Sequence, residues 1–169
     1  MNRILKNFGV VLRGKGIAAL LSVAATGLMA NALPVREFGL IVLVHTYVLV
    51  VRGLLNFRTF EAVVRYGVPC VEERRKGDLF RLLRVTQLVD ISAALAAFLI
   101  AAAAAPLAAR YLHWDSTMVS WAVAYSSVAL ATANGTSNGI LRIYDRFDAL
   151  SVQYTVAPAL RLLGAGIAW

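Results

Sequence analysis

The sequence predicts an all-α fold: a polytopic membrane helix bundle of about five transmembrane helices with a cytoplasmic N-terminus. Of its 169 residues, 60% are hydrophobic and only 15% are charged, whereas a soluble domain typically carries about 25% charged residues. Segments 91–109 and 116–141 contain no charge at all. A helix on the surface of a soluble bundle would show charges along its outer face. The bilayer is therefore the expected solvent.

Five apolar segments give the expected spans, which together form a single transmembrane domain over residues 1–169. The first runs from Gly16 to Leu33 and extends back to Phe8. Pro34 separates it from the second span, which becomes more polar after Val51. The third is rich in alanine, and Pro106 should kink it or mark its outer end. We expect the five spans at about 8–33, 38–66, 79–112, 116–141 and 150–169.

The basic residues between the spans predict the orientation. Segments 1–16, 34–37, 52–84, 110–115 and 142–148 carry 4, 1, 8, 1 and 2 Lys or Arg residues. This alternation follows the positive-inside rule and places the N-terminus in the cytoplasm. The segment around Ala30-Asn31-Ala32 imitates a signal-peptide cleavage site, but the later hydrophobic spans favour an uncleaved first helix. The odd number of spans and the abrupt finish at Trp169 suggest a part of a longer protein; Trp at a membrane interface is also compatible with a natural end.

Polar residues within three of the spans are candidates for a cavity lining, because polar groups in lipid usually face a bundle interior. In the second span, His45, Arg52, Asn56 and Thr59 fall within about 60° of one another at 100° per residue. In the fourth, the polar stripe includes Asn134. Such stripes also serve as interhelical contacts, and Gly135 and Gly139 favour that alternative for the fourth span. His45 is expected to form a hydrogen bond to a neighbouring helix.

The charged residues leave several alternatives open. Arg58, Glu61 and Arg65 have spacings that permit Glu61 to pair with either arginine, and they suit the cytoplasmic interface. Arg52 either lines a cavity or reaches the interface, whereas Arg161 lies near mid-bilayer and favours a cavity. Two arginines at one cavity would suit a phosphate or another anion, because the guanidinium fork matches phosphate oxygens.

Asp90 lies near the membrane entry of the third span. It is a weak candidate for ion coupling, as an acid that takes up H⁺ or Na⁺. An interfacial position, or pairing with Arg84 or Arg58, is the favoured alternative.

The sequence contains no catalytic motif: it lacks G-x-S-x-G, H-E-x-x-H and a P-loop. A single cysteine, Cys70, gives neither a disulfide nor metal-ligand spacing. We therefore expect no enzyme, no metal and no cofactor. The net charge of +8 lies mainly in the segments between spans, where it acts as a topology signal, so we expect no nucleic-acid partner.

The order of these features resembles a known family of transporters. A basic start, Asn2-Arg3-Ile4-Leu5-Lys6-Asn7, precedes the first span, and Ala32-Leu33-Pro34-Val35-Arg36-Glu37-Phe38-Gly39 forms the outer turn. Two further segments are 57–67 (FRTFEAVVRYG) and 139–148 (GILRIYDRFD). The arrangement resembles the bacterial polysaccharide-biosynthesis or O-antigen flippases of the multidrug/oligosaccharidyl-lipid/polysaccharide exporter superfamily. The outer turn departs from the family's usual Leu-Gly-Pro pattern.

The resemblance implies part of the N-terminal lobe of a MATE-like fold in the bacterial inner membrane, with the remaining transmembrane helices on a longer chain. It implies a flippase for undecaprenyl-pyrophosphate-linked oligosaccharide, surrounded by membrane lipid. Arg52, Arg161, Asn56, His45 and Asn134 would be the substrate-binding candidates, with Asp90 for ion coupling. A multidrug antiporter of the same fold and a non-transporting membrane scaffold or assembly protein are the alternatives. An antiporter should show acids in its cavity, whereas the mid-membrane charges here are arginines.

Overall fold

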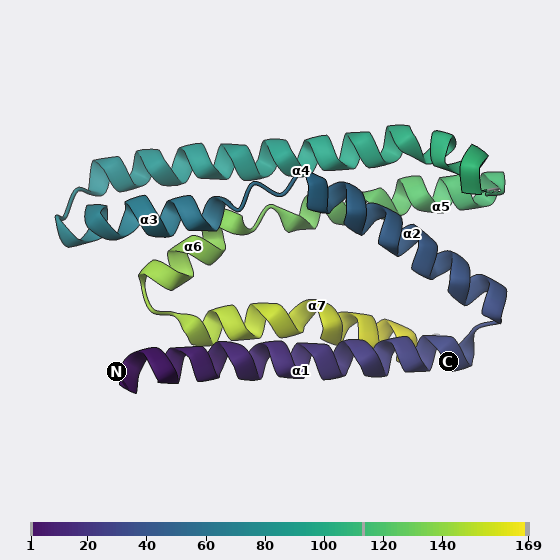
Figure 1. Cartoon of the computed structure of the whole chain (residues 1–169), viewed down its shortest axis with the longest axis horizontal. Helices are drawn as coiled ribbons and strands as arrows, with labels where there is room; N and C mark the ends of the chain where they lie inside the picture. Colours follow the sequence, from purple (N-terminus) through teal and green to yellow (C-terminus); the bar gives the residue numbers. More distant parts are fainter. Residues whose placement is uncertain (1, 113, 168–169) are drawn as a thin grey trace. The chain divides into compact units, whose positions relative to one another are not determined.

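The all-α fold class is confirmed by the computed structural model, which describes residues 2–112 and 114–167. In this part of the chain the structure contains helices and no strand (Figure 1). The elements are α1 (Asn2–Ala32), α2 (Val35–Leu54), α3 (Thr59–Glu72), α4 (Lys76–Leu112), α5 (Ser116–Ser126), the 3-10 helix η1 (Ser127–Thr132), α6 (Gly135–Ile143) and α7 (Phe147–Ile167). The second histidine, His113, and the terminal Trp169 lie outside the described residues.

Three of the described helices are long and apolar enough to cross a membrane. They are Asn7–Ala32 of α1, Val35–Leu54 (α2) and Lys76–Tyr111 of α4. The expected spans 116–141 and 150–169 do not reach this length and mean hydropathy in the described residues. The fourth is divided into shorter helices, and Gln153 and Arg161 reduce the mean hydropathy of α7.

Two of the expected helices are interrupted, so the prediction of continuous helices over 38–66 and 116–141 is wrong. The first interruption covers residues 55–58, between α2 and α3, and the second covers 133–134, between η1 and α6. By contrast, α4 ends at Leu112 as expected and continues past Pro106. The chain separates into two compact units, residues 1–38 with 141–169 and residues 39–140. We describe each unit by itself.

The first unit is built on α1 and α7, which lie side by side (Figure 1). The contacts advance together along the two segments, from Asn7 with Asp145, just ahead of α7, to Gly14 with Ser151 on α7. The two helices therefore run in the same direction. A first and a fifth span run in the same direction if each of the five spans crosses the membrane once, whichever side the N-terminus is on, so the cytoplasmic N-terminus stays a prediction.

A glycine determines how closely α1 approaches α7. A Cβ atom at Gly14 would lie 2.9 Å from both Cα and Cβ of Ser151. Two carbons in ordinary contact are about 3.5–4.0 Å apart, so only glycine fits here. One residue further on, the ammonium of Lys15 lies 5.6 Å from the centre of the Tyr154 ring.

The second unit is organised around α4 and its alanines. Ala94, Ala97, Ala101 and Ala105 are buried at spacings of three and four residues, which places them on one face of the helix. Val44 packs near Ala105, and Val48 packs near Ala97. Because alanine is small, it lets α5 and η1 pack closely against this face, and α2 contacts it at Val44 and Val48.

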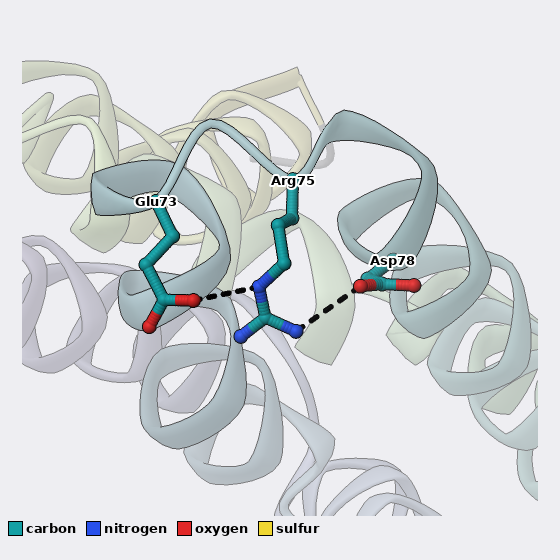
Figure 2. A network of polar contacts seen from close by, with 3 residues as sticks. All are labelled: Glu73, Arg75 and Asp78. Carbon is teal, nitrogen blue, oxygen red and sulfur yellow. Dashed lines mark hydrogen bonds and ion pairs between the residues drawn. The ribbon is translucent and has the colours of Figure 1, made fainter.

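The connection between α3 and α4 is a tight turn that carries the basic residues Arg74 and Arg75. Arg74 adopts a left-handed conformation with φ 55°, and the backbone N–H of Arg75 donates to the carbonyl of Cys70 at 2.8 Å. This geometry is that of a Schellman helix end. The Arg75 side chain lies between Glu73 and Asp78, with N···O distances of 2.8 and 3.1 Å (Figure 2). Hydrogen bonding to Asp78 and the charge of Glu73 raise the pKa of Arg75.

Candidate functional site

The first helix interruption is stabilised locally by an asparagine. The Asn56 side-chain oxygen accepts a hydrogen bond from the backbone N–H of Arg58 at 3.2 Å, and Arg58 has a left-handed φ of 47°. Asparagine side chains compete with helical hydrogen bonding in this way. Asn56 is exposed and lies outside both helices. The prediction that Asn56 shares one continuous helix face with His45 and Arg52 is therefore wrong, because α2 ends before Asn56.

The second interruption follows two serines that bond back to their own helix. Ser126 donates to the Ala122 carbonyl and Ser127 donates to the Ala124 carbonyl, both at 2.7 Å. Such bonds often bend helices, and here α5 tightens into η1. The chain then restarts as α6 at Gly135, with the Asn134 carbonyl accepting the first helical bond from Asn138 at 3.0 Å. Asn134 is thus a half-buried helix-start residue rather than part of a continuous polar stripe.

Both restarting helices meet the carboxylate of Asp90 on α4. The Thr59 hydroxyl, on the first residue of α3, donates to one carboxylate oxygen. The backbone N–H and the hydroxyl of Thr136, on the second residue of α6, donate to the other at 2.6 and 2.7 Å. Thr59 is 7% exposed and Thr136 is 2% exposed. We call these three residues the Asp90 joint.

In the Asp90 joint, a negatively charged side chain lies at the positively polarised ends of two helices. A helix N-terminus carries a partial positive charge and leaves backbone N–H groups unpaired. A carboxylate placed there accepts such groups and is stabilised by the helix dipole. Asp90 meets the first turns of α3 and α6 at the same time. The expected pairing of Asp90 with Arg58 does not form, since Arg58 instead pairs with Glu61 at 3.0 Å.

Close packing of α6 on α3 continues from the joint. A Cβ at Gly135 would lie 2.8 Å from a carboxylate oxygen of Asp90. One turn later, a Cβ at Gly139 would lie 2.6 Å from Cβ of Val63, which is fully buried. The prediction that Gly135 and Gly139 mediate helix packing is confirmed.

His45 hydrogen-bonds another helix, as expected. Its ring nitrogen Nδ1 lies 2.8 Å from the hydroxyl of Tyr125 on α5, and the two rings are nearly perpendicular. Two residues along α2, the Tyr47 hydroxyl donates to the Ala101 carbonyl at 2.6 Å. The Tyr47 ring packs edge-on against Trp114, which lies just beyond the end of α4. These contacts fix α2 to α4 and α5.

The two candidate arginines occupy different units. Arg52 is half-buried in the last turn of α2, about 26 Å from the start of that helix at 1.5 Å per residue. Arg161 is half-buried in α7, about 21 Å from its start on the same basis. Ser151 and Tyr154 precede Arg161 on α7, and both contact α1. That Arg52 and Arg161 face one cavity stays a prediction.

The residues missed by the sequence reasoning are Thr59 and Thr136 as partners of Asp90, and Tyr125 as the partner of His45. The prediction that Thr59 lies on the same helix face as Arg52 requires an uninterrupted helix, and the helix is interrupted between them. One signal was available: the dipeptide Asn134-Gly135 is a typical turn marker and could have indicated the second interruption. No local signal identifies Tyr125.

The comparisons with known proteins give one informative relative. The chain is 27% identical over 166 residues to the inner membrane protein YghQ of Escherichia coli strain K12, and the match covers 98% of this chain. It covers 47% of the relative, so the chain spans about half the length of the relative that it matches. No family model and no solved structure matches. The similarity and the apolar helices together indicate a membrane protein, and they are consistent with the inner-membrane location of the relative.

Proposed function

We propose that the chain is part of a membrane transporter, a flippase that moves lipid-linked oligosaccharide or polysaccharide precursors across the bacterial inner membrane. The observation that carries this proposal is Arg161, a half-buried arginine in the second half of α7, about 21 Å from the start of that helix. A permanent charge at such a depth is costly in lipid, and such residues usually mark a substrate or ion pathway. A guanidinium fork is suited to the pyrophosphate of a lipid-linked sugar.

Two other features support a transporter over a static scaffold. Helices α2–α3 and α5–η1–α6 are interrupted, and discontinuous helices recur in secondary transporters. Arg52 would act at the predicted cytoplasmic end of the same pathway, with His45, Asn56 and Asn134 as further polar candidates. Undecaprenyl-pyrophosphate-linked sugar is the proposed cargo, and further transmembrane helices would complete the cavity.

A multidrug antiporter is the second candidate and is less well supported. Such a protein needs a carboxylate available to H⁺ or to a cationic substrate. The oxygens of Asp90 instead accept three hydrogen bonds from Thr59 and Thr136, so they are already held by donors of the protein itself. The ion-coupling role for Asp90 is therefore not part of our proposal.

The test is substitution of Arg161 in the chromosomal gene. Arg161→Ala should abolish surface polysaccharide and cause lipid-linked precursor to accumulate, with the protein still present in the membrane. Arg161→Lys should retain part of the activity, because charge remains while the fork is lost. Arg81→Ala is the control, because Arg81 is an exposed arginine on α4, away from both interruptions. Normal polysaccharide in Arg161→Ala would contradict the proposal.

A further inference from the structure

The Asp90 joint lies at one boundary of the most apolar part of α4. The uncharged run from Ile91 to Ala109 would be about 28 Å long as a helix, close to the roughly 30 Å of bilayer hydrocarbon. Asp90 directly precedes this run. The segment of α4 before Asp90 contains three basic residues, Lys76, Arg81 and Arg84, and Arg75 lies just ahead of the helix. The joint thus separates an apolar segment of α4 from a polar one.

The helices of the second unit fall into two groups, which contact α4 on either side of Asp90. Helices α3 and α6 hold to the joint and to each other through Gly139 and Val63. Helix α2 and the α5–η1 segment hold to the alanine face of α4, through the clusters around Val44 and Val48. The two groups of helices are connected to each other by the interruptions at 55–58 and 133–134.

We propose that Asp90 holds α3 and α6 as one body against the continuous helix α4, with the two interruptions as the points about which this body opens. Asp90 is the positioning residue that keeps this body together. Its role is to accept hydrogen bonds from Thr59 and Thr136, and it binds neither substrate nor ion. This inference rests on the packing of the second unit and is independent of the cargo.

Asparagine and alanine at position 90 separate hydrogen bonding from charge. In Asp90→Asn the side-chain oxygen can still accept from the N–H and hydroxyl of Thr136, and the Thr59 hydroxyl can turn to accept from the amide NH₂. Asp90→Ala removes every acceptor and leaves the Thr136 N–H and both hydroxyls unsatisfied. If Asp90 acts by accepting these hydrogen bonds, the asparagine variant behaves like the natural protein and the alanine variant does not.

The measurement is the rate at which a buried thiol reacts with N-ethylmaleimide in the purified, detergent-solubilised protein. Val63→Cys in a Cys70→Ser background gives a single thiol one turn from Thr59, at the contact with α6. We expect Asp90→Ala to increase its labelling rate at least tenfold, because loss of the joint favours local opening of α3. Asp90→Asn should change the rate less than threefold. The natural Cys70, buried further along α3 near the turn that precedes α4, should respond less than the thiol at position 63.

Two results would overturn the inference. One is equal labelling in Asp90→Ala and the protein with Asp90; the other is an Asp90→Asn rate that matches that of Asp90→Ala. If Asp90→Ala does not accumulate in membranes, Thr136→Val replaces it, because that variant removes one hydroxyl donor and keeps the backbone N–H. Its labelling rate should then rise at least threefold, and an unchanged rate overturns the inference. Failure of the Arg161 variants to affect polysaccharide would leave these labelling results untouched.

Discussion

Gly14 offers the sharpest test of the first unit, since a methyl group added there has nowhere to go. The Cβ of Gly14→Ala would lie 2.9 Å from two carbon atoms of Ser151, one of them in the backbone. The neighbouring Gly16 has no atom within 4 Å of the same hypothetical Cβ. Two glycines two residues apart on α1 therefore form a matched pair: one at a close helix contact and one in open space.

The magnitude follows from two opposing effects. Alanine is favoured over glycine in a helix by about 1 kcal/mol, and this gain is common to both variants. Overpacking a close contact costs about 1–3 kcal/mol, and only Gly14→Ala incurs it. We therefore expect Gly14→Ala to be less stable than Gly16→Ala by about 1–3 kcal/mol, with Gly16→Ala at or above the stability of the natural chain.

The assay is unfolding of the purified protein in mixed micelles with increasing sodium dodecyl sulfate, followed by circular dichroism. The double variant Gly14→Ala/Ser151→Gly should recover part of the loss, because it removes the Ser151 Cβ and hydroxyl while the Cα remains. A difference below about 0.5 kcal/mol between Gly14→Ala and Gly16→Ala would refute the packing of α1 on α7 described above.

Three further predictions concern the second unit. Tyr47→Phe should reduce the free energy of unfolding by about 1 kcal/mol, because it leaves the Ala101 carbonyl without its 2.6 Å hydrogen bond; an unchanged value in the same assay would count against that contact. Glu61→Gln should change stability by less than about 0.5 kcal/mol, because both partners of the Arg58–Glu61 pair are exposed; a loss above 1 kcal/mol would contradict this reasoning. Lys76→Cys in a Cys70→Ser background should react with a membrane-impermeant maleimide only in inside-out vesicles, and labelling in intact spheroplasts would reverse the predicted orientation.

The sequence was sufficient to predict the helical class and the approximate ends of α1 and α4. Long uncharged runs and alternating basic segments are properties that a single sequence displays directly. The Gly135 and Gly139 contact was also predictable, because small residues four apart commonly mark helix packing. The same spacing could not identify Val63 as the partner on α3.

The interruptions were harder to predict, because no proline enforces either of them. They depend on Asn56 and on paired serines, which can also lie within continuous helices, and on Asp90, which is remote in sequence from both. In the Asp90 joint, Asp90 contacts Thr59 and Thr136, which are 31 and 46 positions away in the sequence. Long-range contacts of this kind depend on the whole tertiary arrangement, so neither Thr59 nor Thr136 could be assigned to Asp90 from periodicity.

The pairing of α1 with α7 also has a consequence for biosynthesis. Gly14 and Ser151 are separated by about 140 residues of chain, which a ribosome translating at roughly 5–20 residues per second needs on the order of ten seconds to make. During that interval α1 must reside in the bilayer, or beside the insertion machinery, with lipid in the place that Ser151 later takes. The close approach at Gly14 thus cannot form before Ser151 has been synthesised and inserted, and defects there should be visible as slow maturation of nascent chains.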